Sequence, residues 1–222
     1  DKNTTFYVIL SWIQAGLHTI KELYSLYLQT FPENGEYFTF ERFSAYLDQL
    51  VELEFLTFKG QKLLLANKGL ACTIFAFKPY TINEMTDRLE KYRDILISEN
   101  HILDKFVALI PTNEVMDPII MRPTDPKTQY RQLLRFADQA FLEVVYPKDF
   151  QRGKCVKTLG LLFSNYFNIR YAKKNSGLYE IPFRADSISL IQNVGRAFAA
   201  YNYLVQHLWK NDPLLVQTVA DL

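Results

Sequence analysis

The residues whose chemistry could serve catalysis are scattered along this chain, and none lies in a reactive arrangement. Ser11, Ser25 and Ser44 lack the sharp glycine-flanked turn that exposes an activated serine nucleophile. The segment GKCVKTLG at 153–160 lacks the Gly-Lys-Ser/Thr ending of a phosphate-binding loop. We therefore expect that the protein is not an enzyme, and we expect no catalytic residues and no cofactor.

The potential metal ligands are equally dispersed. The two cysteines, Cys72 and Cys155, lie 83 residues apart and form no CxxC pair. None of the three histidines, His18, His101 and His207, lies at ligand spacing from a cysteine or another histidine. The sequence therefore predicts no metal site. Two isolated cysteines without a disulfide framework are typical of a reducing compartment, so we expect a cytoplasmic location.

Four carboxylates recur near one face of a predicted helix. Paired carboxylates can transfer protons or bind a metal ion. Basic residues alternate with them in the sequence, which is typical of an exposed helix. We therefore expect no functional role for this group, which consists of Glu84, Asp87, Glu90 and Asp94.

Basic residues offer the first candidate function, contact with nucleic acid. Arg42 and Gln49 lie on the outward face of a predicted helix and could read base edges. Lysines of a predicted hairpin could contact phosphates. Further basic residues between 151 and 196 alternate with aromatic residues, as in some single-strand sites. The stronger alternative is that they form the solvated face of a half-buried hairpin or pair with the acidic middle segment. The candidate nucleic-acid contacts are Arg42, Gln49, Lys59, Lys62, Arg170, Lys173, Lys174 and Arg184.

Acidic residues on the same predicted helix offer an alternative function. Its outward face carries Glu41, Asp48 and Glu52 against Arg42 alone, a local charge of −2. Such a face opposes the neutralisation of phosphates that gives much of the affinity for DNA. The alternative is therefore a protein-assembly or adaptor subunit in which these three carboxylates dock a partner protein.

The elements that position these residues can be predicted from apolar periodicity. Helical spacing predicts helices over about 4–16 and 19–31, and a third from the N-cap Thr39 to Glu54. In the third helix Phe40, Phe43, Leu47, Leu50 and Val51 share one face, which we expect to be buried. Two short apolar runs then flank Lys59-Gly60-Gln61, which predicts a β-hairpin over 55–65.

This order of elements resembles the winged helix-turn-helix family over about residues 4–75. In that family the third helix enters the major groove and the hairpin wing lies over the backbone. The wing of bacterial members typically ends in Leu-Thr-x-x-Gly. Here Leu65-Ala66-Asn67-Lys68-Gly69 keeps the spacing without the threonine. A second departure is Glu54, at the position where the family usually has a glycine in a left-handed helix cap.

The remainder of the chain is predicted to be helical with one further hairpin. Thr81 and Glu84 have the spacing of a capping box at the start of a helix. A second β-hairpin is predicted near 168–183, and Asp212-Pro213 begins a terminal helix. The predicted fold class is mainly α with short β-hairpins. It comprises an N-terminal winged-helix-like domain, 1–78, and a C-terminal helical domain, 79–222.

The bulk composition leaves both functions open. The 222 residues include 25 Lys or Arg and 24 Asp or Glu, so the whole chain has no strong charge. The charge is uneven, because residues 151–222 have nine basic against four acidic residues. No apolar run reaches the length of a membrane span, so we expect no membrane partner. The partner is nucleic acid in the first interpretation, and a partner protein or a second copy of the chain in the second.

Overall fold

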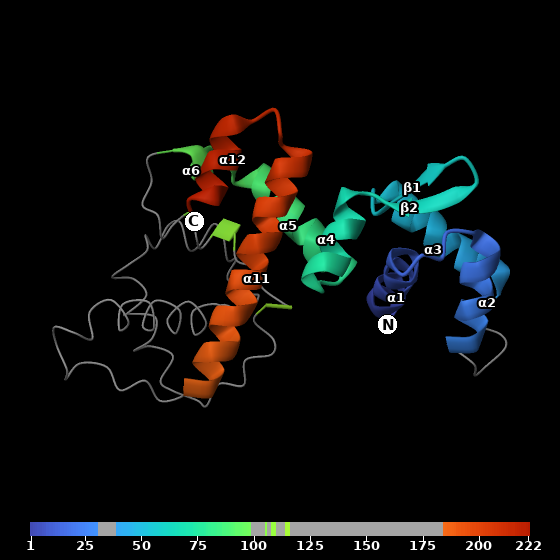
Figure 1. Ribbon diagram of the computed structural model, residues 1–222. Coiled ribbons are helices and arrows are strands. Elements are labelled where there is room, and N and C mark those ends of the chain that lie inside the picture. The colour runs from blue at the N-terminus through green and yellow to red at the C-terminus, as the bar shows by residue number, and fades with distance from the viewer. Residues whose placement is uncertain (31–38, 99–104, 106–107, 110–113, 116–183) are drawn as a thin grey trace.

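The computed structural model describes residues 1–30, 39–98, 105, 108–109, 114–115 and 184–222, with the backbone alone for 184–191 (Figure 1). These residues form helices and one two-stranded antiparallel sheet, which confirms a mainly α fold with a short hairpin. The predicted second hairpin near 168–183 lies outside the described residues. The elements are α1 (Lys2–Gln14), α2 (Ile20–Thr30), α3 (Phe40–Glu52), β1 (Leu56–Lys59), β2 (Lys62–Leu65), α4 (Asn67–Phe75), α5 (Pro79–Lys91), α6 (Arg93–Ile97), α11 (Arg184–Leu208) and α12 (Pro213–Ala220).

Helix α4 lies between two groups of elements (Figure 1). On one side it contacts α1 and β2, and on the other it contacts α5 and α11. Helix α11 also packs on α12, which in turn contacts α6. One apolar cluster runs through all these contacts, from Phe6 in α1 to Val219 in α12. Its burial holds α4 to both groups, since burying an aliphatic or aromatic side chain stabilises a fold by about 1.5–3 kcal/mol.

Local sequence signals explain where α2 and α3 begin. Thr19 and Glu22 form a capping box, in which the Thr19 amide donates to Glu22 Oε2 at 3.1 Å and the Glu22 amide donates to Thr19 Oγ1 at 3.3 Å. Thr39 caps α3 as predicted, because its Oγ1 accepts from the Arg42 amide at 3.3 Å. Each cap satisfies amides that have no partner within the first helical turn.

Helix α3 ends in a Schellman motif without glycine. The Phe55 amide donates to the Leu50 carbonyl at 2.8 Å, and the Glu54 amide donates to the Val51 carbonyl at 3.0 Å. Glu54 has φ +64°, the left-handed conformation for which the resembled family uses glycine. Such a conformation costs a side-chain-bearing residue roughly 1–2 kcal/mol. Lys68 partly offsets this cost, since its Nζ lies 3.8 Å from Glu54 Oε2 and donates to the Leu53 carbonyl at 3.2 Å.

The hairpin turns at Gly60 and is fixed at its base. Gly60 has φ +64°, a value that glycine adopts at little cost at the first central position of a two-residue hairpin loop. Strand β2 is also held to the α1–α2 connection, because the Leu63 amide donates to the His18 carbonyl at 2.8 Å. The first turn of α4 requires Gly69, since a Cβ there would lie 2.2 Å from the Phe55 carbonyl oxygen. This contact gives a physical reason for the glycine that ends the segment 65–69.

The predicted capping box of the next helix is wrong. Helix α5 begins at Pro79, two residues before Thr81. Thr81 is buried and donates its hydroxyl to Glu114 Oε2 at 2.5 Å, and the Lys78 amide donates to the same oxygen at 2.9 Å. Glu84 accepts instead from Arg88 Nη2 at 3.0 Å, one turn further along. A carboxylate 33 residues distant from Thr81 therefore takes the place that the local pattern assigned to Glu84.

An ion pair connects α6 to α12. Asp212 caps α12 by accepting from the Leu215 amide at 3.3 Å, as the Asp-Pro pair predicts, and it also accepts from Arg93 Nε at 2.5 Å. The hydrogen bond from Arg93 lowers the pKa of the Asp212 carboxyl, and the same bond raises the pKa of Arg93. This pair joins segments that lie 119 residues apart in the sequence.

A candidate interaction surface on the third helix

The outward face of α3 carries a straight stripe of four exposed residues: Glu41, Ala45, Asp48 and Glu52. Their spacing of four, three and four residues keeps them within one sector of the helix surface. Three of the four are carboxylates, and the small Ala45 lies between the first two. We call this group the acidic stripe.

The three carboxylates have no ion pair with any other residue that the structure describes. The nearest cation in the sequence, Arg42, is exposed but occupied on its own helix. Its Nε donates to the Tyr46 hydroxyl at 2.9 Å, and its guanidinium carbon lies 5.8 Å from the centre of the Tyr46 ring. The acidic stripe therefore presents a concentrated negative charge to the surroundings.

Exposed apolar side chains lie at the two ends of α3, on its flanks and off the line of the acidic stripe. Phe40, the first residue of α3, is 48% exposed, and Leu53, its C-cap, is 40% exposed. The sequence pattern placed Phe40 on the buried face, but about half of its side chain is exposed, and it meets α2 through an edge contact with the Tyr24 ring, at 5.2 Å between centres. The buried face itself is confirmed by Phe43, Leu47 and Leu50. The exposure of Phe40 could not be predicted from its helical angle, because Phe40 lies at the end of the helix, beyond the edge of the core.

Gln49, a predicted base-reading residue, is half-buried. Its Oε1 atom is buried and accepts no hydrogen bond from any described residue. A base-reading side chain must extend its amide to the base edge. The position of Gln49 therefore favours contact with the body of the protein over contact with a groove.

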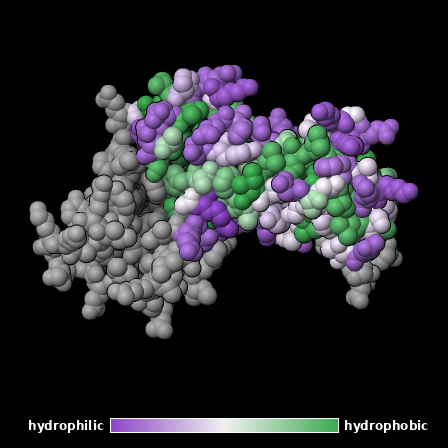
Figure 2. All heavy atoms as spheres, in the orientation of Figure 1, coloured by the Kyte–Doolittle hydropathy of each residue, from purple (hydrophilic) through white to green (hydrophobic). Residues whose placement is uncertain are grey.

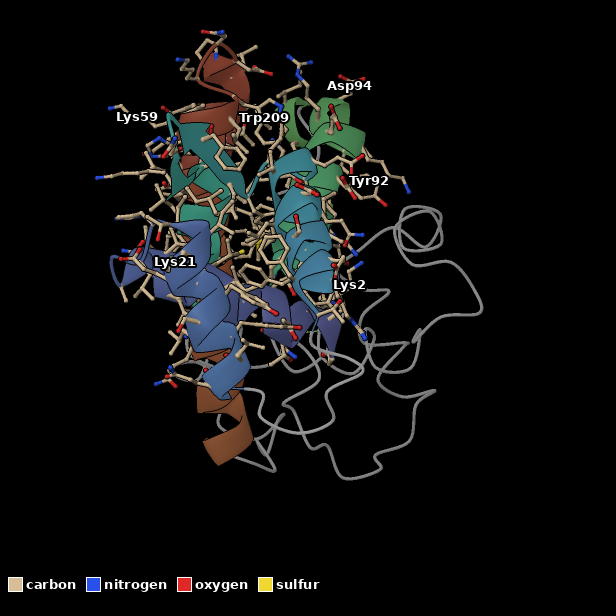
Figure 3. All side chains as sticks on the ribbon, turned by 90° about the vertical axis from the view of Figure 1, so that its right-hand side faces the viewer. Lys2, Lys21, Lys59, Tyr92, Asp94 and Trp209 are labelled. Atoms are coloured by element: carbon tan, nitrogen blue, oxygen red, sulfur yellow. The ribbon has the colours of Figure 1, made fainter. Side chains whose placement is uncertain are left out.

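The two predicted hairpin lysines are both exposed. Lys59 and Lys62 face each other across the end of the hairpin, and Phe58 beside them is 49% exposed. Figure 3 shows Lys59 extending away from the fold. Lys68 is not available in the same way, because its Nζ donates to the Leu53 carbonyl and to Asn83 Oδ1, each at 3.2 Å.

The remaining predicted basic residues are not tested by this structure. Arg170, Lys173 and Lys174 lie outside the described residues. Arg184 is the first residue of α11, and its side chain is likewise outside them. Hydrophilic side chains cover much of the hairpin end of the molecule, with hydrophobic ones between them (Figure 2). The structure therefore describes the α3 and hairpin candidates and leaves the downstream basic segment as a prediction.

Within the described residues there is no group of three or more His, Cys, Asp or Glu that could hold a metal ion. In the same residues no helix has both the length and the apolar character that crossing a membrane requires. Cys72 is a buried free thiol. Burial raises its pKa, so a smaller fraction of the thiol is present as the reactive thiolate.

Comparisons of the chain with protein-family models, with curated proteins and with solved structures find no match.

Proposed function

We propose that this protein is a non-enzymatic assembly subunit that docks a partner protein through the acidic stripe of α3. The observation that carries the proposal is the set of three exposed carboxylates without an ion pair among the described residues. Unpaired like charges on one helix face repel one another, so a cationic partner relieves that repulsion. The same charges repel phosphate, which argues against DNA in contact with this helix.

We further propose that residues 1–78 form a winged-helix-like module that presents α3, followed by a helical domain over 79–222. Three helices followed by an antiparallel hairpin support this assignment. The left-handed Glu54 supports it as well, because it takes the conformation that the resembled family gives to a glycine. The two isolated cysteines support a cytoplasmic location.

Charge reversal on the stripe tests the docking function. Asp48→Lys combined with Glu52→Lys should remove the bound partner in affinity purification with quantitative mass spectrometry, and far-UV circular dichroism should stay unchanged. A matched control is Asp87→Lys with Glu90→Lys, which makes the same charge change at exposed positions of α5. The docking function is wrong if the stripe variant and the control retain the same partners.

The hairpin supports nucleic-acid binding as a second candidate function. Lys59 and Lys62 are exposed side by side at its end, and neither has an ion pair with another described residue. Lysines so placed can neutralise phosphates, and each neutralised phosphate contributes about −0.9 to the slope of log affinity against log salt.

A duplex and a single-stranded oligonucleotide, titrated at low salt, test this candidate. Lys59→Glu with Lys62→Glu should weaken binding and reduce the salt slope by about two, if both lysines contact phosphates. Lys173→Glu with Lys174→Glu tests the downstream basic segment in the same way. Absence of binding to either oligonucleotide at low salt would exclude this candidate.

A further inference from the structure

We propose that the outer edge of strand β1 binds an acidic segment of a partner protein, which adds to the hairpin as a further antiparallel strand. This surface is separate from the acidic stripe, so the inference goes beyond the docking function proposed above and does not depend on it. Its occupant is an extended backbone that pairs with Phe58 and presents an acidic side chain beside Lys59.

The register of the hairpin shows which backbone groups of β1 point outward. Lys59 and Lys62 flank a two-residue loop, which makes them a hydrogen-bonded pair. At the other end of the hairpin the Ala66 amide donates to the Phe55 carbonyl at 3.0 Å. In an antiparallel ladder such bonded pairs alternate with pairs whose amides and carbonyls point to the outer edges. By this alternation Phe58 directs its amide and carbonyl away from β2.

The two edges of the hairpin differ in whether these outward groups have partners. On β2 the Leu63 amide donates to the His18 carbonyl at 2.8 Å, and the Leu63 carbonyl oxygen lies 3.1 Å from His18 Nδ1. On β1 neither the amide nor the carbonyl of Phe58 has a hydrogen bond with any described residue. A strand edge with unpaired groups is a template for another strand. Addition of an extended peptide to such an edge is a recurring form of protein recognition.

The open part of this edge is short and exposed. Leu56 is only 2% exposed, so the fold covers the start of β1. Phe58 is 49% exposed, and its neighbours Thr57 and Lys59 are exposed as well. Figure 1 shows the hairpin extending from one end of the described part of the molecule. The edge therefore offers one bonded pair centred on Phe58, and two backbone hydrogen bonds of this kind give a weak, reversible contact.

The side chains of β1 define those of the added strand. Phe58 lies on the same face of the hairpin as the buried Leu56, and Lys59 lies on the opposite face. Lys62 is directly across from Lys59, and neither lysine has an ion pair with another described residue. Opposite charges on neighbouring strands stabilise a sheet. The added strand accordingly has an acidic side chain beside Lys59 and an apolar one beside Phe58.

Charge and hydrogen bonding favour this occupant over a second copy of the chain or a nucleic acid. A second hairpin would bring Lys59 and Lys62 of another copy to the same edge, where like charges repel. A phosphate chain would neutralise the lysines, but phosphate oxygens accept hydrogen bonds and supply no donor for the Phe58 carbonyl. A polypeptide strand has both an amide and a carbonyl at each residue.

The test uses synthetic peptides of about six residues, a usual strand length. In the edge peptide an apolar residue is placed opposite Phe58, and acidic residues precede it because an antiparallel strand begins near the hairpin turn. The blocked peptide is N-methylated at the residue opposite Phe58, whose amide would donate to the Phe58 carbonyl. The control peptide is N-methylated at the next residue, whose amide points away from β1. Binding to the full, isotope-labelled chain is measured by amide chemical-shift titration in NMR.

We expect the edge peptide to shift the amide signal of Phe58. The blocked peptide should bind roughly 2- to 13-fold more weakly, the equivalent of one net hydrogen bond, and the control peptide should bind as the edge peptide does. Lys59→Glu with Lys62→Glu should weaken the edge peptide by a factor of about 1.4 to 5 for each lysine that contacts a carboxylate. Lys91→Glu with Lys210→Glu makes the same charge change at exposed positions outside the hairpin and should have a much smaller effect.

Two substitutions of Phe58 isolate its amide. Phe58→Ala and Phe58→Pro both remove the ring, and only Phe58→Pro removes the outward amide. The proline removes no hydrogen bond of the hairpin, because this amide does not pair with β2, and edge strands accept proline at such positions. Phe58→Pro should therefore bind the edge peptide more weakly than Phe58→Ala, while far-UV circular dichroism of the two variants stays the same.

Several results would overturn an acidic strand at this edge. Equal binding of the blocked and control peptides would show that no backbone pairing occurs, and no binding of the edge peptide would reject the inference. Binding that is unaffected by Lys59→Glu with Lys62→Glu would exclude recognition of charge. A single-stranded oligonucleotide that shifts the hairpin signals when no peptide does would assign the lysines to nucleic acid. A concentration-dependent dimer that Phe58→Pro abolishes in sedimentation experiments would identify a second copy as the occupant.

Discussion

The contact between Gly69 and the Phe55 carbonyl allows a sharp test of the fold. In Gly69→Ala the new Cβ would lie 2.2 Å from that oxygen, well inside van der Waals contact. The neighbouring atom belongs to the backbone, and the Phe55 carbonyl also accepts from the Ala66 amide at 3.0 Å. Relief of the clash therefore requires α4 to shift relative to the end of α3, which weakens this hydrogen bond.

We expect Gly69→Ala to lower the free energy of unfolding by about 1–3 kcal/mol, the usual cost of overpacking a closely packed site. For a chain of this size the midpoint of thermal unfolding falls by about 2–4 °C for each kcal/mol. The control is Gly195→Ala in α11, where a Cβ meets no atom within 4 Å. This change should stabilise the protein by roughly 0.5–1 kcal/mol, because alanine favours the helix more than glycine does.

The same substitution is thus expected to have opposite signs at the two glycines. The stability of both variants is compared with that of the unchanged protein by thermal and urea unfolding. Unfolding is followed by the negative circular dichroism band of the helices in the far ultraviolet. If Gly69→Ala is as stable as Gly195→Ala, the close contact between Gly69 and the Phe55 carbonyl does not limit the size of the side chain at position 69.

Three further predictions concern helix ends. Glu54→Gly should be more stable than Glu54→Ala by about 1 kcal/mol in urea unfolding. Both variants lose the contact with Lys68, and only glycine adopts φ +64° without cost. Equal stability of the two variants would contradict a strained backbone at Glu54. Thr39→Ala should cost about 0.5–2 kcal/mol by the same assay through loss of the α3 cap, whereas Thr39→Ser should be nearly neutral. The folded pKa of Asp212 lies below its ordinary value of 3.8, so its contribution to stability is present above that value and lost as the pH falls through the folded pKa. Asp212→Asn should therefore reduce the loss of stability between pH 5 and pH 2 in acid unfolding, and an unchanged acid profile would exclude the pair with Arg93 as its cause.

The features predicted correctly from sequence are those whose causes lie within a few residues. Thr39 caps α3 because its hydroxyl reaches the amide three residues later. The hairpin forms around Gly60 because a tight turn there needs a positive φ. In both cases the interacting groups are close in the chain, so their spacing alone identifies them.

The wrong or missing predictions involve groups that meet only after the chain folds. Thr81 and Glu84 have the local spacing of a capping box. In the fold, however, the Thr81 hydroxyl donates to Glu114, which lies 33 residues away in the sequence. Lys68 follows the hairpin closely in the sequence, yet in the fold it donates to the Leu53 carbonyl at the end of α3 and to Asn83 in α5. The exposure of Phe40 likewise depends on where the core ends, which its helical angle does not report.

Lys68 also supports the proposed use of α3 as a docking surface. Its Nζ donates to the Leu53 carbonyl at the end of α3 and to Asn83 in α5, each at 3.2 Å, and only 14% of its side chain is exposed. The buried face of α3 holds the helix from within, and Lys68 holds its C-terminal end to the next helices. A surface fixed in this way loses little conformational freedom on binding, so more of the attraction of its charges appears as affinity. The inner face and the end contact of α3 therefore maintain the fold, and neither uses a residue of the acidic stripe.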